Sequence, residues 1–171
     1  REGCIQVQGT INGYGERCGN ANLCSIIPDL ELKMGINALP KGQLVNMFDL
    51  SHYVAEVANL APDEQLAYVG RSAFAHKGGI HVAAMRRTSQ SYQHIDPELV
   101  GNRMEVIVSE LSGRGNLVSK AEEFGITLEH DGQAAEVLQV VKELESKGFS
   151  FEAAEASVRM LFKRSEKKYK A

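Results

Sequence analysis

The stretch that decides the fold is residues 9–24, GTINGYGERCGNANLC. It holds four glycines and the adjacent pair Glu16 and Arg17. Glycine permits positive φ angles and lets the backbone approach a ligand closely. Polar side chains gathered in a glycine-rich loop after a strand are typical of one wall of an active site. A glycine-rich turn with a structural ion pair carries equal weight on local pattern alone.

The residues around this loop predict a βα unit. Residues 4–11 alternate apolar and polar side chains, which predicts a strand. Apolar residues then recur at helical spacing over 20–34, with Pro28 expected to bend or divide the helix. Strand, loop and helix in this order build parallel sheets and barrels. Because a lone strand needs a partner, we expect the chain to be a piece excised from a larger protein.

The rest of the chain is predicted to be mostly α with little β. A short strand is expected at 104–109, and we expect irregular structure over 66–75 and a loop over 88–103. Helices are predicted over 41–60, 76–87, 116–124 and 132–147, and Asp131 is the predicted N-cap of the helix over 132–147. A last helix is predicted with Ser150 as its cap. Its apolar face would consist of Phe151, Ala154, Val158, Leu161 and Phe162.

Composition excludes several classes of protein. The net charge is −3 and 24% of residues are charged, which argues against a nucleic-acid partner. No apolar run approaches the roughly 18–20 residues of a membrane span. Three cysteines are an odd number, so a disulfide framework is not expected, and we predict a cytoplasmic location.

Local pattern gives few residues a definite chemical role. Asn20 begins a helix, where an anion or a metal-bound oxygen is favoured. His76 and His81 are five residues apart, roughly 140° around a helix, so they do not share a face for a metal. His76 is either a structural histidine, which the pattern favours, or an acid–base group facing a cleft. Tyr92 packs by default, and His94 is ambiguous.

Five motifs in order resemble one family over nearly the whole chain. The acetyl-CoA-dependent 2-oxoacid synthases, which comprise isopropylmalate, homocitrate and citramalate synthases, have similar motifs. The HKGGIHV and FEAAEAS forms resemble the citramalate synthase branch most. The motifs are GTINGYGERCGNANL (9–23), AHKGGIHVAA (75–84), YQHIDPELVGN (92–102), SELSGRGNL (109–117) and FEAAEASVRMLFKR (151–164).

The resemblance implies an architecture. Residues 1–40 would be the last βα unit of a (β/α)8, or TIM, barrel. Residues 41–95 would form a first linker subdomain and residues 96–171 a second, helical one. In this family a regulatory domain often follows.

The resemblance also implies a Claisen-type condensation of acetyl-CoA with a 2-oxoacid, which is pyruvate in the citramalate branch of isoleucine biosynthesis. Asn20 would be one ligand of a divalent metal, Mg²⁺ or Mn²⁺ with Zn²⁺ as a further candidate. Glu16 and Arg17 would shape the loop. His76 would assist proton transfer, and Tyr92 would line the acyl-CoA or oxoacid site. Both would reach the partner's barrel in a homodimer.

Other functions stay open. Isopropylmalate or homocitrate synthase is the alternative within the family, and a lyase of the hydroxymethylglutaryl-CoA type ranks lower. A non-catalytic helical dimerisation module is the alternative of another class. Since the other metal ligands of the family would lie outside residues 1–171, we expect this chain alone to be inactive.

Overall fold

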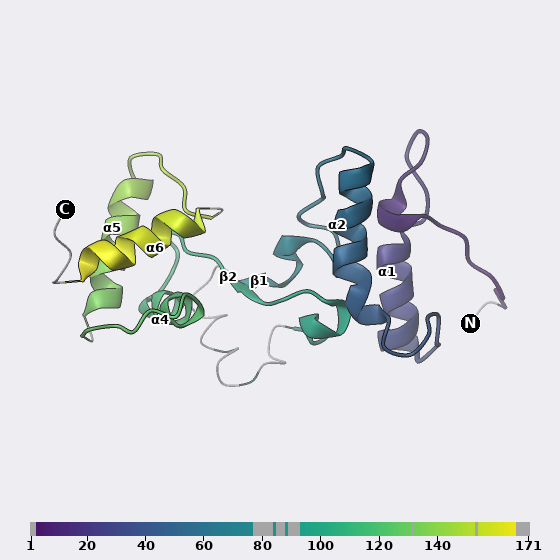
Figure 1. Ribbon diagram of the computed structural model, residues 1–171, viewed down its shortest axis with the longest axis horizontal. Helices are drawn as coiled ribbons and strands as arrows, with labels where there is room; N and C mark the ends of the chain where they lie inside the picture. The colour runs from purple at the N-terminus through teal and green to yellow at the C-terminus, as the bar shows by residue number, and fades with distance from the viewer. Residues whose placement is uncertain are drawn as a thin grey trace. The chain divides into compact units, whose positions relative to one another are not determined.

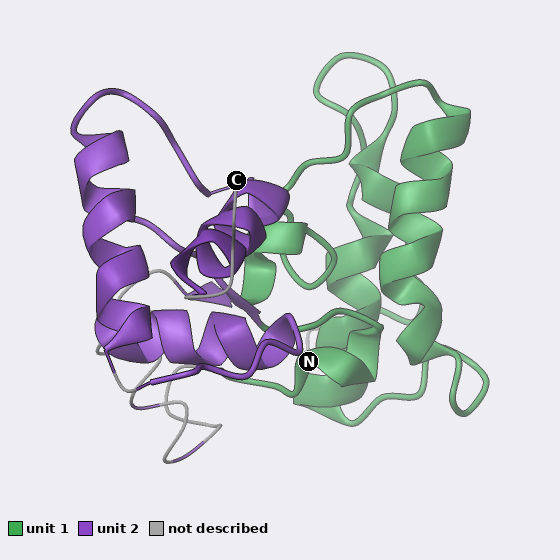
Figure 2. Cartoon of the chain, turned by 60° about the vertical axis from the view of Figure 1, so that its left-hand side comes forward, with its two compact units in different colours: residues 1–74, 94–104 green, residues 75–93, 105–171 purple. Residues whose placement is uncertain are grey.

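The computed structural model describes residues 3–76, 84, 88, 93–130, 132–152 and 154–166 (Figure 1). The chain divides into two units, one of residues 1–74 and 94–104 and the other of residues 75–93 and 105–171 (Figure 2). It therefore passes from one unit to the other three times, after residues 74, 93 and 104. Within the described residues helices dominate and strands are short, as predicted. No helix among them is long and apolar enough to cross a membrane.

The first helix of the first unit is divided at Pro28, as predicted. Helix α1 spans Leu23–Pro28 and continues as the π-helical turn η2, Asp29–Lys33. Proline has no amide hydrogen to donate, so the regular helical bonding changes there. The helix begins later than the predicted Asn20, because the side chain of Asn22 caps it by accepting a hydrogen bond from the amide of Cys24 at 2.9 Å.

The strand predicted over residues 4–11 is wrong. Only Thr10 forms a bridge, with Asn22, through hydrogen bonds of 3.0 Å on either side of it. The side chains of Ile5 and Val7 are 102% and 52% exposed. Alternation of apolar and polar residues marks a chain that suits a sheet, but a strand also needs a neighbour to exchange hydrogen bonds with. The described residues supply no such neighbour for residues 4–9.

The helix predicted over 41–60 is confirmed, but its buried face differs in part. It consists of a 3-10 turn, η3 (Leu44–Asn46), and helix α2 (Met47–Val57). The sequence pattern predicts an apolar face of Leu44, Phe48, His52 or Tyr53, Ala55 and Val57. Tyr53 and Val57 are instead 65% and 69% exposed. The buried positions follow one stripe at intervals of three or four residues, which is the spacing of a single helix face. They are Leu44, Met47, Ser51 and Ala55.

Three short 3-10 helices complete the described part of the first unit: η1 (Ile11–Gly13), η4 (Arg71–Phe74) and η6 (Pro97–Val100). Asp96 caps η6 by accepting a hydrogen bond from the amide of Glu98 at 3.0 Å, in the segment predicted as a loop. The next residue after η6, Gly101, has φ of 76°, and a Cβ there would lie 2.0 Å from the carbonyl oxygen of Val45. The core of the unit is made of Cys24, Leu44, Met47, Tyr68, Val69, Phe74 and Val100.

In the described part of the second unit, a two-stranded parallel sheet is joined to helices α4, α5 and α6. Strand β1 (Ala75–His76) pairs with β2 (Glu105–Val106), which confirms the short strand predicted at 104–109. The helices are α4 (Arg114–Glu123), α5 (Gln133–Glu145) and α6 (Glu155–Ser165), close to the predicted ranges. Most of the helix predicted over 76–87, and the predicted N-cap Asp131, lie outside the described residues.

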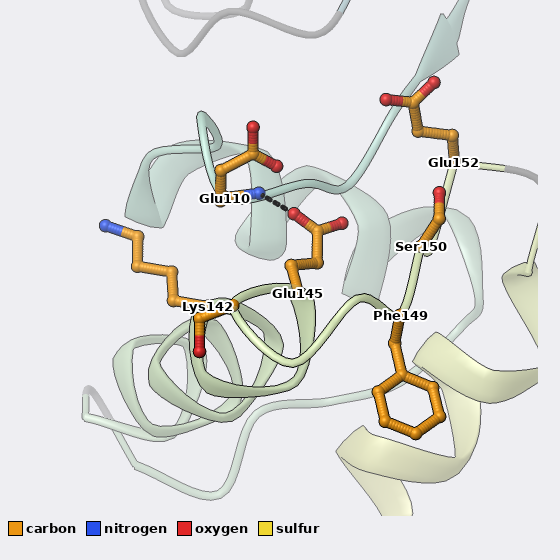
Figure 3. A pocket seen from close by; sticks show the side chains of 7 residues that line it. Glu110, Lys142, Glu145, Phe149, Ser150 and Glu152 are labelled. Carbon is orange, nitrogen blue, oxygen red and sulfur yellow. Dashed lines mark hydrogen bonds between the residues drawn. The ribbon is translucent and has the colours of Figure 1, made fainter.

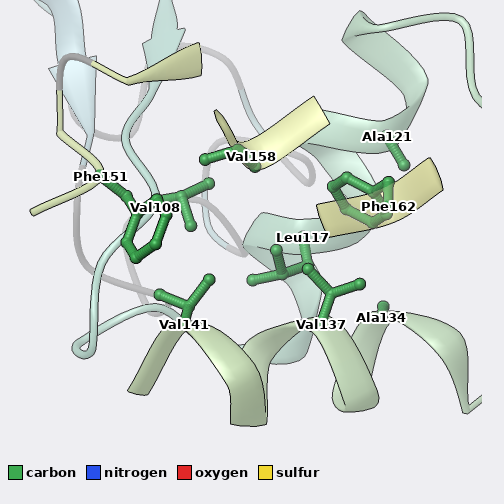
Figure 4. Close-up of a cluster of buried hydrophobic side chains, with 9 residues drawn as sticks. All are labelled: Val108, Leu117, Ala121, Ala134, Val137, Val141, Phe151, Val158 and Phe162. Atoms are coloured by element: carbon green, nitrogen blue, oxygen red, sulfur yellow. The ribbon is translucent and has the colours of Figure 1, made fainter. Parts of the chain in front are cut away.

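Helices α4, α5 and α6 pack around one apolar core (Figure 4). Helix α5 contributes Ala134, Val137 and Val141, which lie on one face at intervals of three and four residues. Figure 4 shows these side chains opposite residues of α4 and α6. The fully enclosed members include Leu117 of α4 and Phe162 of α6, each 0% exposed. These residues bury the apolar surface that holds the unit together.

The cap predicted at Ser150 is wrong, because α6 begins at Glu155 and its N-cap is Ala154. Phe151 is buried in the core from the segment before the helix. The carboxylate of Glu155 accepts a hydrogen bond at 2.5 Å from Nζ of Lys120, which is 3% exposed. This tertiary contact fixes the first turn of α6 and outweighs the local preference of serine for a cap.

Candidate functional site

The glycine loop of the first unit is closed by its own backbone. Asn12, Gly13, Arg17 and Gly19 have φ angles of 61°, 69°, 55° and 84°. The amide of Asn20 donates to the carbonyl oxygen of Gly13 at 2.8 Å. A Cβ on Gly19 would lie 2.3 Å from that same oxygen, so only glycine fits there. The high glycine content thus serves a tight, self-bonded loop.

This loop orients the side chain of Asn20. Its Nδ2 donates to the carbonyl oxygen of Tyr14 at 3.0 Å, and the hydroxyl of Thr10 donates to the same oxygen at 2.7 Å. A Cβ on Gly15 would lie 2.0 Å from Nδ2, so the glycine leaves room for the amide. Asn20 is exposed, and within the described part of the chain its Oδ1 has no hydrogen-bond partner. An amide oxygen held in this way suits a hard divalent cation.

Asn20 alone does not make a metal site. Among the described residues no group of three or more His, Cys, Asp or Glu side chains could hold a metal ion. The donor chemistry of Asn20 therefore fits one ligand of a larger set. Glu16 and Arg17 pair with each other at 2.9 Å, with side chains 84% and 83% exposed. Such a solvated pair contributes little to stability.

The loop is attached to α2 through Asn12. The Nδ2 atom of Asn12 donates to the carbonyl oxygen of Ser51 at 2.8 Å, and the hydroxyl of Ser51 donates to Oδ1 of Asn12 at 2.6 Å. The thiol of Cys24 also donates to Oδ1, at 3.4 Å. Burial raises the pKa of the Cys24 thiol, although the contacts with Asn12 and Ser51 act in the opposite direction. The hydrogen bonds between Asn12 and Ser51 thereby anchor the glycine loop to helix α2.

Of the two other predicted site residues, the structure describes only His76. His76 is buried at 8% exposure in strand β1 of the second unit, where its carbonyl oxygen accepts a hydrogen bond from the amide of Ile107 at 3.0 Å. Tyr92 lies outside the described residues. Asn20, Glu16 and Arg17 therefore share one loop, while His76 belongs to the other unit.

The structure reveals a cluster of polar and aromatic residues that the sequence did not disclose. The hydroxyl of Tyr68 donates to Oδ1 of Asp29 at 2.5 Å, and the ring of His94 meets the ring of Tyr68 edge to face at 5.6 Å. Nζ of Lys33 donates to the carbonyl oxygen of His94 at 3.2 Å. The only local signal is that Asp29 and Lys33 are one helical turn apart.

Burial and charge shift two pKa values in this cluster. Burial, reinforced by Asp29, raises the pKa of Tyr68 to about 12. Burial and the nearby charge of Lys33 lower the pKa of His94, while Asp29 acts in the opposite direction. The phenol therefore stays protonated and donates to the carboxylate throughout the neutral range.

Tyr68 is also held through its backbone. Its φ angle is 67°, a left-handed conformation that is rare and costly for a bulky residue. The buried side chain of Asn102 donates to the carbonyl oxygens of Tyr68 and Gly70, each at 2.9 Å. The backbone amide of Asn102 donates to the carbonyl oxygen of Pro97 at 3.0 Å. Asn102 thus clamps the turn that contains Tyr68 onto η6.

The second unit has an open pocket of about 400 Å³ (Figure 3). The amide of Glu110 donates to Oε2 of Glu145 at 2.6 Å. Burial and the neighbouring carboxyl of Glu110 raise the pKa of Glu145. The described residues that form this pocket do not include His76, and they are Glu110, Lys142, Glu145, Ser146, Phe149, Ser150 and Glu152.

Similarity to known proteins agrees with the motifs. Residues 68–148 match the family described as homocitrate synthase post-HMGL domain-like. The chain is 56% identical over 165 residues to an (R)-citramalate synthase of Geobacter sulfurreducens, in an alignment that covers 96% of the chain and 31% of the relative. An (R)-citramalate synthase of Synechocystis is 51% identical over 164 residues, which is 95% of the chain and 30% of the relative.

The chain is therefore similar over nearly its whole length to part of two proteins named (R)-citramalate synthase. A 2-isopropylmalate synthase of Sulfolobus acidocaldarius is 36% identical over 154 residues, covering 90% of the chain and 39% of that relative. The sequence identity to these two citramalate synthases is thus higher than that to this 2-isopropylmalate synthase, in agreement with the motifs. The chain spans about a third of the length of the curated relatives it matches.

Proposed function

We propose that the chain is part of an enzyme that condenses acetyl-CoA with pyruvate to form citramalate. The observation that carries the proposal is 56% identity to a relative named (R)-citramalate synthase over 96% of the chain. In this Claisen-type reaction the acetyl methyl carbon loses a proton and adds to the carbonyl carbon of pyruvate. Water then hydrolyses the thioester and releases CoA. The product would serve isoleucine biosynthesis in the cytoplasm.

The proposed architecture of the whole enzyme is a (β/α)8 barrel followed by linker subdomains. Residues 1–40 would be the last βα unit, 41–95 the first linker subdomain and 96–171 the second. The exposed apolar side chains of Ile5 and Val7 support this arrangement, since residues 4–11 would gain strand partners within a barrel. Helix α1 follows the glycine loop in the order that a βα unit requires.

Asn20 would hold a divalent cation, Mg²⁺ or Mn²⁺ with Zn²⁺ as a further candidate, together with ligands outside this chain. When bound, the cation would act as a Lewis acid toward the 2-oxo group of pyruvate. The contribution of this chain is to orient an oxygen ligand. Nδ2 of Asn20 donates to the carbonyl oxygen of Tyr14, and Gly15 leaves room for this nitrogen, so Oδ1 is the atom that would serve as the ligand. Glu16 and Arg17 would shape the outer part of the same loop.

His76 would assist in moving the proton of the acetyl methyl group, and Tyr92 would line the acyl-CoA or oxoacid site. An imidazole titrates near neutral pH and can both accept and donate a proton. The short strand β1 fixes the backbone of His76, because Ile107 donates to its carbonyl oxygen at 3.0 Å. A fixed backbone supports a precise position for the ring.

The functional enzyme is proposed to be a homodimer in which His76 and Tyr92 serve the partner's barrel. Helix α2 offers apolar side chains on its exposed side, with Leu50, Tyr53 and Val57 at 39%, 65% and 69% exposure. Exposed apolar groups at helical spacing support an interface with another surface. Sedimentation analysis of the full-length protein would give twice the monomer mass if this holds, and a monomer would contradict it.

The reaction is tested with the full-length protein, acetyl-CoA and Mg²⁺ or Mn²⁺, supplied with pyruvate, 2-oxoisovalerate or 2-oxoglutarate. Release of CoA is followed with a thiol reagent. We expect pyruvate to be preferred. Preference for 2-oxoisovalerate would identify a 2-isopropylmalate synthase, and preference for 2-oxoglutarate a homocitrate synthase. No CoA release with any oxoacid, combined with self-association, would favour the non-catalytic dimerisation module.

The role of Asn20 is tested by substitution. Asn20→Ala removes the amide oxygen, so we expect Mn²⁺ affinity, measured by calorimetry on the full-length protein, to fall at least ten-fold. Asn37→Ala is the matched control, because Asn37 is an exposed asparagine outside the glycine loop. Equal Mn²⁺ affinity in the two variants would remove Asn20 from the set of ligands.

A further inference from the structure

The chain crosses between the two units three times, after residues 74, 93 and 104. At each crossing, a residue of the first unit at or near the crossing point is connected to Tyr68. Phe74 is the last residue before the first passage, and His94 is the first residue after the second. The rings of Phe74 and His94 have centroids 6.5 Å apart. The two residues that flank segment 75–93 therefore lie beside each other in the first unit.

Tyr68 lies at the centre of this arrangement. Its ring meets the ring of His94 at 5.6 Å, and Tyr68 and Phe74 belong to the same buried core. We call Tyr68, Phe74 and His94 the aromatic cluster. Asn102, which clamps the backbone of Tyr68, lies two residues before the third passage at residue 104. All three passages thus connect to Tyr68 through contacts within the first unit.

Several contacts fix Tyr68 itself. Its hydroxyl donates to Asp29 at 2.5 Å, and Asn102 holds its carbonyl oxygen at 2.9 Å. Lys33 holds the carbonyl oxygen of His94 at 3.2 Å. A left-handed backbone at a bulky residue persists only where surrounding contacts determine it, and such positions concentrate at functional sites. Tyr68 has φ of 67° in this setting.

The passages lead directly to the proposed proton-transfer residue. His76 follows Phe74 by two residues, and β1 pairs with β2, which begins just after the third passage. Resting on the proposed function, we propose that Tyr68 is a positioning residue for the condensation: the aromatic cluster holds together Phe74 and His94, the residues that flank segment 75–93, and thereby limits the positions that His76 can take. Tyr68 acts through Phe74 and His94 and does not itself touch substrate.

Tyr68→Phe in the full-length protein tests this inference, because it removes the bond to Asp29 and keeps the ring. Asn37→Ala is the control, since Asn37 is exposed and lies outside both the aromatic cluster and the glycine loop. The first readout is hydrogen exchange at the amide of Ile107, which donates to His76. We expect exchange there to accelerate about ten-fold in Tyr68→Phe, with the amides of Val137 and Val141 in α5 unchanged. Unchanged exchange at Ile107, or equal acceleration in α5, would overturn the proposal.

The second readout is kinetic. We expect kcat to fall about ten-fold while KM for acetyl-CoA changes less than two-fold, since small displacements of a catalytic group mainly slow the chemical step. Asp29→Asn retains an acceptor for the phenol and should keep near wild-type kcat, whereas Asp29→Ala should resemble Tyr68→Phe. A loss of kcat in Asp29→Asn equal to that in Asp29→Ala would contradict the role of the hydrogen bond.

The two proposals fail in different ways. If the wild-type protein releases no CoA with any oxoacid, the proposed function fails. The exchange experiment still decides whether Tyr68 controls the position of β1. If the wild-type protein is active and Tyr68→Phe matches Asn37→Ala in both exchange and kcat, only the positioning role fails.

Discussion

Asn12 and Ser51 hold each other at two points across 39 residues of sequence. Asn12 donates through Nδ2 to the backbone of Ser51 at 2.8 Å, and Ser51 donates through its hydroxyl to Oδ1 of Asn12 at 2.6 Å. Both residues are at least partly buried, so each bond replaces contact with water. This pair makes the glycine loop part of the packed first unit.

We therefore expect substitutions of this pair to destabilise the protein. Ser51→Ala removes one donor and should lower the free energy of unfolding by about 1 kcal/mol. Asn12→Ala should cost roughly 2–3 kcal/mol, because it removes both bonds and places alanine at φ of 61°. Urea denaturation measures both values. Ser72→Ala, at an exposed serine, is the control, and a loss equal to that of Ser51→Ala would contradict the prediction.

The buried charge of Lys120 gives a second prediction. Its Nζ binds Glu155 at 2.5 Å and Glu123 at 3.0 Å, and it lies 5.2 Å from the centre of the Phe124 ring. Glu155→Ala leaves a buried ammonium group with one carboxylate fewer, so it should destabilise the protein by on the order of 2 kcal/mol.

Lys120→Met is expected to cost less than Glu155→Ala, because an apolar side chain of similar length needs no charged partner. Thermal unfolding compares the two variants, with Glu143→Ala on the exposed side of α5 as a control. If Lys120→Met were the more damaging change, the ion pairs would contribute more stability than the desolvation of the ammonium group removes.

Tyr68 should ionise at a higher pH than an ordinary tyrosine. Its pKa is about 12, raised first by burial and then by the hydrogen bond and charge of Asp29. Because the folded pKa lies above the ordinary value, the contribution to stability is complete below pH 10 or so and is lost as pH rises toward about 12. Tyrosinate absorbance should show one of the five tyrosines ionising late. Tyr68→Phe should remove that step, and its persistence would assign it to another tyrosine.

The raised pKa of Glu145 should make the free energy of unfolding depend on pH in the acidic range. Its pKa is raised by burial and by the carboxyl of Glu110. The folded state therefore binds the proton of Glu145 more tightly than the unfolded state does. The stability that this proton contributes is complete below the ordinary glutamate pKa, and it is lost as the pH rises through the raised pKa of the folded state. Glu145→Gln should remove that decline from the curve of unfolding free energy against pH. Glu143→Gln is the control, and an unchanged slope in Glu145→Gln would contradict the prediction.

Local chemistry explains what the sequence could predict. The break at Pro28 and the ends of α4 and α5, near Gly125 and Gly148 with positive φ angles, depend on the backbone properties of single residues. The density of glycines located the loop around Asn20 for the same reason. These features need no knowledge of distant neighbours.

Features that depend on tertiary contacts could not be predicted. The strand at 4–11 needed a partner strand, and the start of α6 was decided by the contact of Glu155 with Lys120. The bond between Tyr68 and Asp29 joins residues 39 positions apart, so no local pattern indicates it. The aromatic cluster became visible only when the chain was folded.

The three passages of the chain bear on how such a protein can evolve. Residues 94–104 return to the first unit after the second has begun, so neither unit is encoded by one uninterrupted stretch. A single recombination event within the gene cannot exchange one unit and leave the other whole. Descent would therefore have to preserve both units together, with point substitutions as the main route of change in each.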